Sequence, residues 1–153
     1  MTANPFSGKT LAVMLGGTAA ERTISLESGE NVARALEQAG AQVLRVDTAE
    51  AGWPEQLKEA SFAFNLLHGP GGEDGTVQGL FELMKLPYSG CDLMASALTM
   101  DKVRTKWLWQ GLGLPTPAFQ QLTSETNWQA VICLLYTSPS PRDLSTSRMP
   151  SSA

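Results

Sequence analysis

The chain has 153 residues, of which 42% are hydrophobic and 17% are charged, and its formal net charge at pH 7 is -4. This composition is typical of a globular domain with a hydrophobic core, and the mild acidity offers no basic patch for nucleic acid or for an anionic membrane. The apolar run from Leu11 to Leu15 is too short for a signal peptide or a membrane span, and the distant Cys91 and Cys133 exclude a disulfide framework and fit a reducing cytoplasm.

The first predicted strand covers residues 9–15, a short apolar run that ends in Gly16-Gly17 and therefore leads into a tight loop. A helix is expected next, with Ser25 as its N-cap and Gly40 as its stop, because small polar residues cap helix starts and glycine ends helices. Its apolar positions recur at helical spacing: Val32, Leu36 and Ala39.

Further strands and helices alternate along the next fifty residues. Residues 43–46 form the second predicted strand, and residues 53–59 form a short helix. Residues 62–67 are the clearest strand. Residues 76–85 are predicted to be an amphipathic helix, because their apolar side chains fall at i, i+3, i+4 and i+7. A fourth short strand is expected near Tyr88.

This order of strands and helices predicts an α/β fold with an open parallel sheet flanked by helices, joined by right-handed crossovers. In such sheets ligands bind beyond the carboxyl ends of the strands. Two glycine-rich loops follow predicted strands at that edge.

The rest of the chain is predicted to leave the sheet. A long helix is expected over residues 93–110, a break over 111–117 and a strand over 118–122. After Ile132 the sequence is mostly Ser, Thr and Pro, which is typical of a linker or a disordered terminus. The segment CLLYTSPSPRD, residues 133–143, also resembles a translated sequencing-adapter junction, so this tail is left out of the functional interpretation.

The two loops are GGTAAER, residues 16–22, and HGPGGEDGTVQG, residues 68–79. Neither is a P-loop or a dinucleotide-binding fingerprint. Their glycines let backbone N–H groups approach a small ligand, and His68, Glu21 and Glu73 add charge beside them. A carboxylate and an imidazole at neighbouring strand ends suit a zwitterion, with Glu21 holding an ammonium group and a protonated His68 holding a carboxylate. The start of the helix at Thr76 would face the same crevice.

Each of these residues also has a purely structural interpretation. His68 could be a satisfied residue at a strand end, and Glu21 could form a surface ion pair with its neighbour Arg22. Glu73 and Asp74 could simply charge the N-terminus of the following helix. No metal ligands are assigned, because one histidine and scattered carboxylates do not give ligand spacing.

Three segments resemble a known family. They are GGTAAERTISLESG, HGPGGEDGTVQGLFELMKLPYSG and MASALTMDKVRTKWLWQGLGLPTP. In order and spacing they are similar to consecutive segments of D-alanine–D-alanine ligases, which belong to the ATP-grasp superfamily. The resemblance extends from about Leu11 to Leu122, and the HGxxGEDGxxQG run is specific to that family.

The resemblance implies a Rossmann-like, pre-ATP-grasp domain over residues 1–100, the start of an ATP-grasp domain over 101–132, and a non-native or disordered tail over 133–153. It implies a cytoplasmic ligase that uses ATP and Mg²⁺ to join two D-alanines for peptidoglycan, commonly as a homodimer. By the same resemblance Glu21, to which a catalytic role is also given, and His68 contact the first D-alanine. Gly69 lies beside them, and Lys102 lies near the nucleotide phosphates.

The same comparison indicates what this chain lacks after Ile132: the central ATP-grasp strands, a second phosphate-binding lysine and the magnesium ligands. We therefore expect the chain by itself to be inactive, because the chemistry requires two substrates and Mg²⁺ to be positioned together. Two alternatives stay open at this stage. One is a D-alanine–D-lactate type ligase, and the other is a non-catalytic α/β module that binds an amino acid.

Overall fold

The computed structural model describes residues 5–119, 121–129 and 131–132. The chain forms two compact units, Met1–Thr105 and Lys106–Ala153. The first unit contains a parallel sheet, its flanking helices and both glycine-rich loops. The predicted tail after Ile132, including the adapter-like segment, lies outside the described residues.

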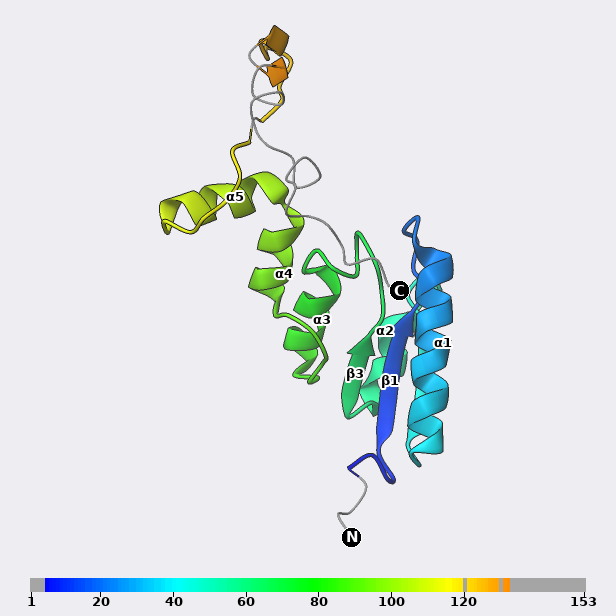
Figure 1. Ribbon diagram of the computed structural model, residues 1–153. Coiled ribbons are helices and arrows are strands. Elements are labelled where there is room, and N and C mark those ends of the chain that lie inside the picture. The colour runs from blue at the N-terminus through cyan, green and yellow to red at the C-terminus, as the bar shows by residue number, and fades with distance from the viewer. Residues whose placement is uncertain (1–4, 120, 130, 133–153) are drawn as a thin grey trace, which may run out of the picture. The chain divides into compact units, whose positions relative to one another are not determined.

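A three-stranded parallel sheet occupies the centre of the first unit, in the order β2-β1-β3 (Figure 1). Its strands are β1 (Thr10–Leu15), β2 (Gln42–Asp47) and β3 (Phe62–Asn65). The predicted parallel α/β architecture is confirmed. β3 is two residues shorter than expected, and the fourth strand expected near Tyr88 is reduced to a single bridge with Ala63. Pro87 has no N–H to donate and Gly90 turns the chain with a φ of 105°, so this segment stays short.

The side chains of β1 alternate between two hydrophobic clusters, one on each face of the sheet. Residues 11, 13 and 15 pack on one face with Ala33 and Leu36. Residues 12 and 14 pack on the other face with Val46 and Phe81, among others. Because alternate strand residues point to opposite faces, a strand buried on both sides has a continuously apolar sequence, as residues 11–15 do.

Helix α1 (Arg22–Gln38) covers the face formed by the odd-numbered residues of β1. The expectation that Ser25 caps this helix is wrong, because the helix begins one turn earlier and its N-cap is Glu21. Ser25 is fully buried in the first turn, and its hydroxyl donates to the Leu66 carbonyl at 2.7 Å. The predicted stop at Gly40 is confirmed, since Ala39 is the C-cap and Gly40 follows with a φ of 84°.

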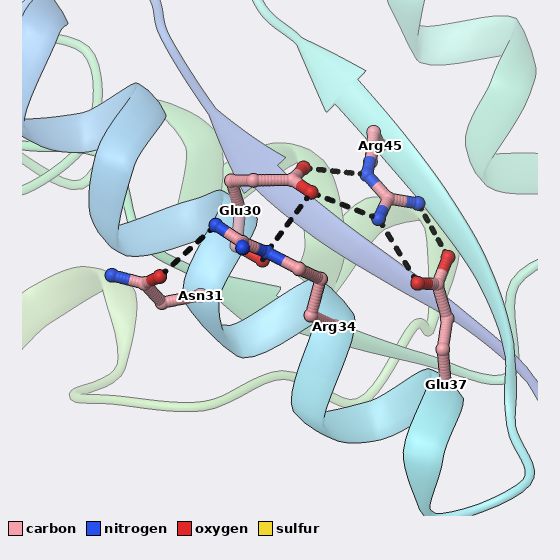
Figure 2. A network of polar contacts seen from close by, with 5 residues as sticks. All are labelled: Glu30, Asn31, Arg34, Glu37 and Arg45. Atoms are coloured by element: carbon pink, nitrogen blue, oxygen red, sulfur yellow. Dashed lines mark hydrogen bonds and ion pairs between the residues drawn. The ribbon is translucent and has the colours of Figure 1, made fainter.

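The exposed side of α1 is tied to β2 by an ion-pair network, shown in Figure 2. The Arg45 guanidinium on β2 donates to Glu30 at 2.7 Å and to Glu37 at 2.6 Å, both on α1. These hydrogen bonds lower the pKa of both carboxyl groups and raise that of Arg45. The network fixes the register of the helix against the edge strand.

The opposite face of the sheet is covered by shorter elements. These are α2 (Trp53–Gln56), a 3-10 turn over Leu57–Glu59 and α3 (Thr76–Met84). The short helix predicted over residues 53–59 is therefore two consecutive turns of different type, while the amphipathic helix after Thr76 is found at its expected place. Phe81 is fully buried and anchors α3 to the sheet.

The long helix predicted over residues 93–110 is wrong, because the structure has two helices there, α4 (Leu93–Met100) and α5 (Lys102–Gly111). They are separated at Asp101, whose backbone is extended, with a ψ of 97°. The Asp101 carboxylate accepts N–H bonds from Val103 and Arg104 and so starts a new helix. Local capping overrides an apolar periodicity that runs through both helices.

In the second unit, the described residues after Gly111 form no strand, so the strand predicted over 118–122 is not found at residues 118, 119, 121 and 122. The Lys106 ammonium group donates to Thr116 and to the Pro117 carbonyl and lies 5.1 Å from the centre of the Phe119 ring. These contacts hold the end of the predicted break, residues 116 and 117, and Phe119 beyond it. Within the part of the chain that the structure describes, no helix has the length and apolarity to cross a membrane.

Candidate functional site

Two loops leave the carboxyl edge of the sheet beside each other. The first glycine loop, residues 16–21, joins β1 to α1, and the second glycine loop, residues 66–75, joins β3 to α3. Because β1 and β3 are parallel neighbours, both loops start from the same edge. The Leu66 N–H donates to the Met14 carbonyl, which places the start of the second loop directly beside the end of β1.

A pocket of about 260 Å³ lies between the two loops. Its walls come from three parts of the sheet edge: the first glycine loop, the second glycine loop, and the segment after β2 that carries Thr48 and Trp53. Its lining includes the apolar side chains of Trp53, Leu67 and Leu80, together with His68. This is the position at which open α/β sheets bind ligands, and the pocket has room for a small molecule.

The first glycine loop is held in shape by Asp47, the last residue of β2. The Asp47 carboxylate accepts two N–H bonds from Arg22, at 2.9 and 2.6 Å, and further bonds from the backbone N–H groups of Gly17 and Ala49. The Arg22 guanidinium also donates to the Gly17 carbonyl at 2.8 Å. The hydrogen bonds from Arg22 hold the pKa of Asp47 well below its usual range, although partial burial works in the opposite direction.

This arrangement corrects one sequence-based alternative, in which Arg22 pairs with its neighbour Glu21. Arg22 pairs with Asp47 instead, which leaves the Glu21 side chain exposed and without a partner among the described residues. Gly16 is required here. It has a φ of 72°, and a Cβ on it would lie 2.4 Å from an Asp47 oxygen.

The second glycine loop is held by its own carboxylates. Glu73 accepts the N–H of Gly69 at 2.8 Å, and Asp74 accepts the N–H groups of Gly71 and Thr76. These backbone donors lower the pKa of Asp74 despite its partial burial. Glu73 and Asp74 therefore do more than charge the N-terminus of α3, because they close the turn that leads into it.

These bonds change the expected use of the glycine amides. The loops were expected to present free N–H groups to a ligand, but the N–H groups of Gly17, Gly69, Gly71 and Gly72 all donate to protein acceptors. These four N–H groups are therefore not free to bind a ligand. The glycines instead provide space for close approach of the two loops.

Glu21 and His68 are the charged side chains that the structure brings to this edge. Glu21 is the last residue of the first loop and the N-cap of α1, and His68 is half-buried in the second loop. The Glu21 carboxylate approaches the second loop so closely that a Cβ on Gly69 would lie 2.9 Å from its oxygen. Within the described part of the chain, neither side chain forms a hydrogen bond or ion pair, so both are available to a ligand.

Lys102 makes its described contact outside the two glycine loops. It is exposed at the start of α5, and its ammonium group donates to the Thr99 carbonyl at 3.1 Å. The structure gives it no contact with either glycine loop among the described residues. No group of three or more His, Cys, Asp or Glu side chains that could hold a metal ion is found in that same part of the chain.

Sequence reasoning missed three residues of this edge: Asp47, Trp53 and Gln78. Asp47 could have been noticed, because a carboxylate at the carboxyl end of a buried strand points into the crevice where ligands and loops meet. Trp53 carried no such signal, because a tryptophan in a short helix is typical of an ordinary core position. Gln78 is the glutamine of the HGxxGEDGxxQG run, but the run by itself does not tell what its side chain contacts.

The chain is similar to proteins of known family. Residues 46–91 match the family described as D-ala D-ala ligase N-terminus. The chain is 54% identical over 127 residues to the D-alanine–D-alanine ligase of Aromatoleum aromaticum, which covers 82% of the chain and 41% of the relative. It is 51% identical over 125 residues to that of Mannheimia succiniciproducens, covering 80% of the chain and 40% of the relative.

Solved structures agree with the sequence comparisons. The D-alanine–D-alanine ligase of Bacillus anthracis superposes with a TM-score of 0.73 at 31% identity, over 81% of this chain and 42% of that one. The same enzyme in complex with ATP gives a TM-score of 0.71, over 78% of this chain and 42% of that one. The chain thus spans about two fifths of the length of the relatives it matches. The resemblance to the N-terminal part of D-alanine–D-alanine ligases is confirmed.

Proposed function

We propose that this chain is the N-terminal part of an ATP-dependent ligase that joins two D-alanines into D-alanyl-D-alanine, a precursor of peptidoglycan. The observation that carries the proposal is that Glu21 lies beside Gly69 and that His68 lines the neighbouring pocket, both at the carboxyl edge of the sheet. By this proposal residues 1–100 are the pre-ATP-grasp domain and residues 101–132 begin the ATP-grasp domain. The working enzyme is a cytoplasmic homodimer.

The two side chains have complementary tasks in this reaction. The Glu21 carboxylate faces open space beside Gly69 and would bind the ammonium group of the first D-alanine. The His68 imidazole in the pocket wall would bind its carboxylate when protonated. Held at both ends, the substrate has its carboxylate in a fixed position for activation. Gly69 contributes by having no side chain where Glu21 approaches.

ATP supplies the activating phosphoryl group when it is bound. Of the residues described, Lys102 is the one proposed to face its phosphates, and its ammonium group would have to leave the Thr99 carbonyl to do so. No set of described residues fits Mg²⁺, so the ligands of Mg²⁺ are not assigned to this part of the chain.

A chimera tests the proposal. The segment of this chain that aligns with the Aromatoleum aromaticum ligase, at 54% identity over 127 residues, replaces its counterpart in that enzyme. The expected result is formation of D-alanyl-D-alanine with release of phosphate from ATP. A folded chimera that binds ATP but forms no dipeptide contradicts the proposal, and formation of an ester with D-lactate instead would change the second substrate.

Site variants in the chimera test the assignments. Because charge-assisted hydrogen bonds are lost, His68→Ala and Glu21→Gln should each lower kcat/KM for the first D-alanine by roughly ten- to a hundredfold. Glu27→Gln is the matched control, since Glu27 is an exposed carboxylate on the same helix, α1. Its kinetics should equal those of the unmodified chimera. Wild-type KM for D-alanine in both site variants would show that these residues belong to the scaffold.

A further inference from the structure

The second glycine loop is fixed at one carbonyl by two amide side chains. The Gly72 carbonyl accepts an N–H bond from the Asn65 side chain at 2.9 Å and another from the Gln78 side chain at 2.8 Å. Asn65 is the last residue of β3, and Gln78 lies in the first turns of α3. The strand before the loop and the helix after it therefore hold the same atom of the loop.

The position of Gly72 within the loop makes this contact effective. The N–H groups of Gly72 and Glu73 both donate to the Gly69 carbonyl, which closes the turn directly after His68. Gly72 also packs on Leu67, because a Cβ on Gly72 would lie 2.3 Å from that of Leu67. A displacement of the Gly72 carbonyl would thus be passed to Gly69 and to the neighbouring His68.

Gln78 is an unfavourable choice if its only task is to fill the core. The residue is 4% exposed, and its side-chain oxygen accepts no hydrogen bond from any described residue. A buried acceptor without a partner destabilises a fold, and native proteins contain few of them. The Gln78 amide directs its NH₂ group at the Gly72 carbonyl, because its oxygen in that place would face another acceptor.

A methionine has a similar shape and would remove that buried acceptor. Gln78 also lines a pocket of about 350 Å³, together with His68 and Glu73. The Gln78 amide therefore lowers the stability of the core through its unpaired oxygen, and its NH₂ group holds the second glycine loop through the Gly72 carbonyl.

From these contacts we infer that Gln78, together with Asn65, is a positioning residue that sets the orientation of His68 through the Gly72 carbonyl. The effect of Gln78 on D-alanine binding rests on the function proposed above. The effect of Gln78 on the orientation of the loop does not depend on that function. The two parts can therefore be measured separately.

The first measurement uses the ¹⁵N-labelled 153-residue chain without ligand. The chain has one histidine, so the imidazole signals in its NMR spectrum report on His68 alone. Gln78→Met should shift these signals and speed exchange of the Gly72 and Glu73 amide protons by about tenfold, because their turn loses an anchor. The melting temperature should stay within about 4 °C of wild type, because the lost hydrogen bond is offset by removal of the buried acceptor.

Two further variants make the result specific. Gln78→Glu keeps the length of the side chain but places an oxygen opposite the Gly72 carbonyl, so it should disturb the same signals. Thr105→Val is the control, because it removes a buried hydroxyl whose bonds go to the Leu98 and Asp101 carbonyls, away from the second glycine loop. It should lower the melting temperature without moving the His68 signals.

The second measurement adds D-alanine and follows the same His68 signals. Wild type should bind, and Gln78→Met should bind about tenfold more weakly. If wild type shows no response to D-alanine while the loop changes as expected, the proposed function fails for this chain and the positioning role stands. Unchanged His68 signals and amide exchange in Gln78→Met would overturn the positioning role. So would loss of the fold in that variant, because Gln78 would then be a core residue only.

Discussion

Replacing Asp47 by asparagine removes the charge that organises the first glycine loop. In the wild type this carboxylate accepts four N–H bonds, two from Arg22 and one each from Gly17 and Ala49. Asparagine keeps one oxygen, and its NH₂ group faces the Arg22 guanidinium, so at least one donor is left facing another donor. The change is nearly isosteric, which separates the loss of charge from the loss of packing.

The expected loss of stability depends on the exposure of Asp47 and Arg22 as well as on the number of hydrogen bonds. Asp47 is 9% exposed, so its charge is poorly hydrated without these partners. The Arg22 side chain is 41% exposed, so in the variant its guanidinium can be hydrated by water, which reduces the free-energy penalty of losing its partner. Hydrogen bonds to charged groups contribute about 1.5–3 kcal/mol, so we expect the free energy of unfolding to fall by about 2–3 kcal/mol. For a chain of this size that corresponds to a melting temperature lower by roughly 10 °C.

The effect should depend on pH with a defined sign. The hydrogen bonds from Arg22 depress the pKa of Asp47 in the folded chain, while an unfolded aspartate titrates near about 3.9. As the pH falls below about 5, the unfolded chain takes up the proton first, and the stability supplied by the charged Asp47 is progressively lost. Wild type and Asp47→Asn should therefore differ most at pH 7 and converge as the pH approaches 2.

Thermal unfolding followed by circular dichroism at several pH values measures this difference. Glu50→Gln is the control, because it removes an exposed carboxylate three positions further along and should leave the melting temperature within about 2 °C of wild type. Equal melting temperatures of wild type and Asp47→Asn at pH 7 would refute the stabilising role of the Arg22–Asp47 ion pair. A difference of the same size at pH 7 and pH 2.5 would show that charge is not its cause.

Two further substitutions test the packing that supports the loops. Gly29→Ala should lower the free energy of unfolding, measured by urea titration, by about 1–3 kcal/mol, because the new Cβ would lie 2.5 Å from that of Leu15. This loss should exceed the gain from the higher helix propensity of alanine. Equal or higher stability of the variant would contradict the close approach of α1 to β1. Ser25→Ala should lower the free energy of unfolding by about 1–2 kcal/mol, because the buried hydroxyl donates to the Leu66 carbonyl at the start of the second glycine loop. An unchanged melting temperature would indicate that water binds this carbonyl in place of the Ser25 hydroxyl.

The sequence by itself determined the elements whose signals are local. The apolar run of β1, the helical periodicity of α3 and the glycine at the end of α1 are read from neighbouring residues, and they appear near their expected positions. The parallel sheet followed from the order of these elements, and Glu21 and His68 were selected because their loops follow strands that a parallel sheet places side by side.

Only the tertiary structure decided which polar groups pair. Arg22 bonds with Asp47, 25 positions away, and Ser25 bonds with Leu66, 41 positions away, whereas the sequence suggested a neighbour pair and a helix cap. Side chains of this kind have several possible partners within a few residues, and the choice depends on which backbone groups the sheet brings close. The same reason hides Gln78, because its task depends on a carbonyl that reaches it only after strand, loop and helix have packed together.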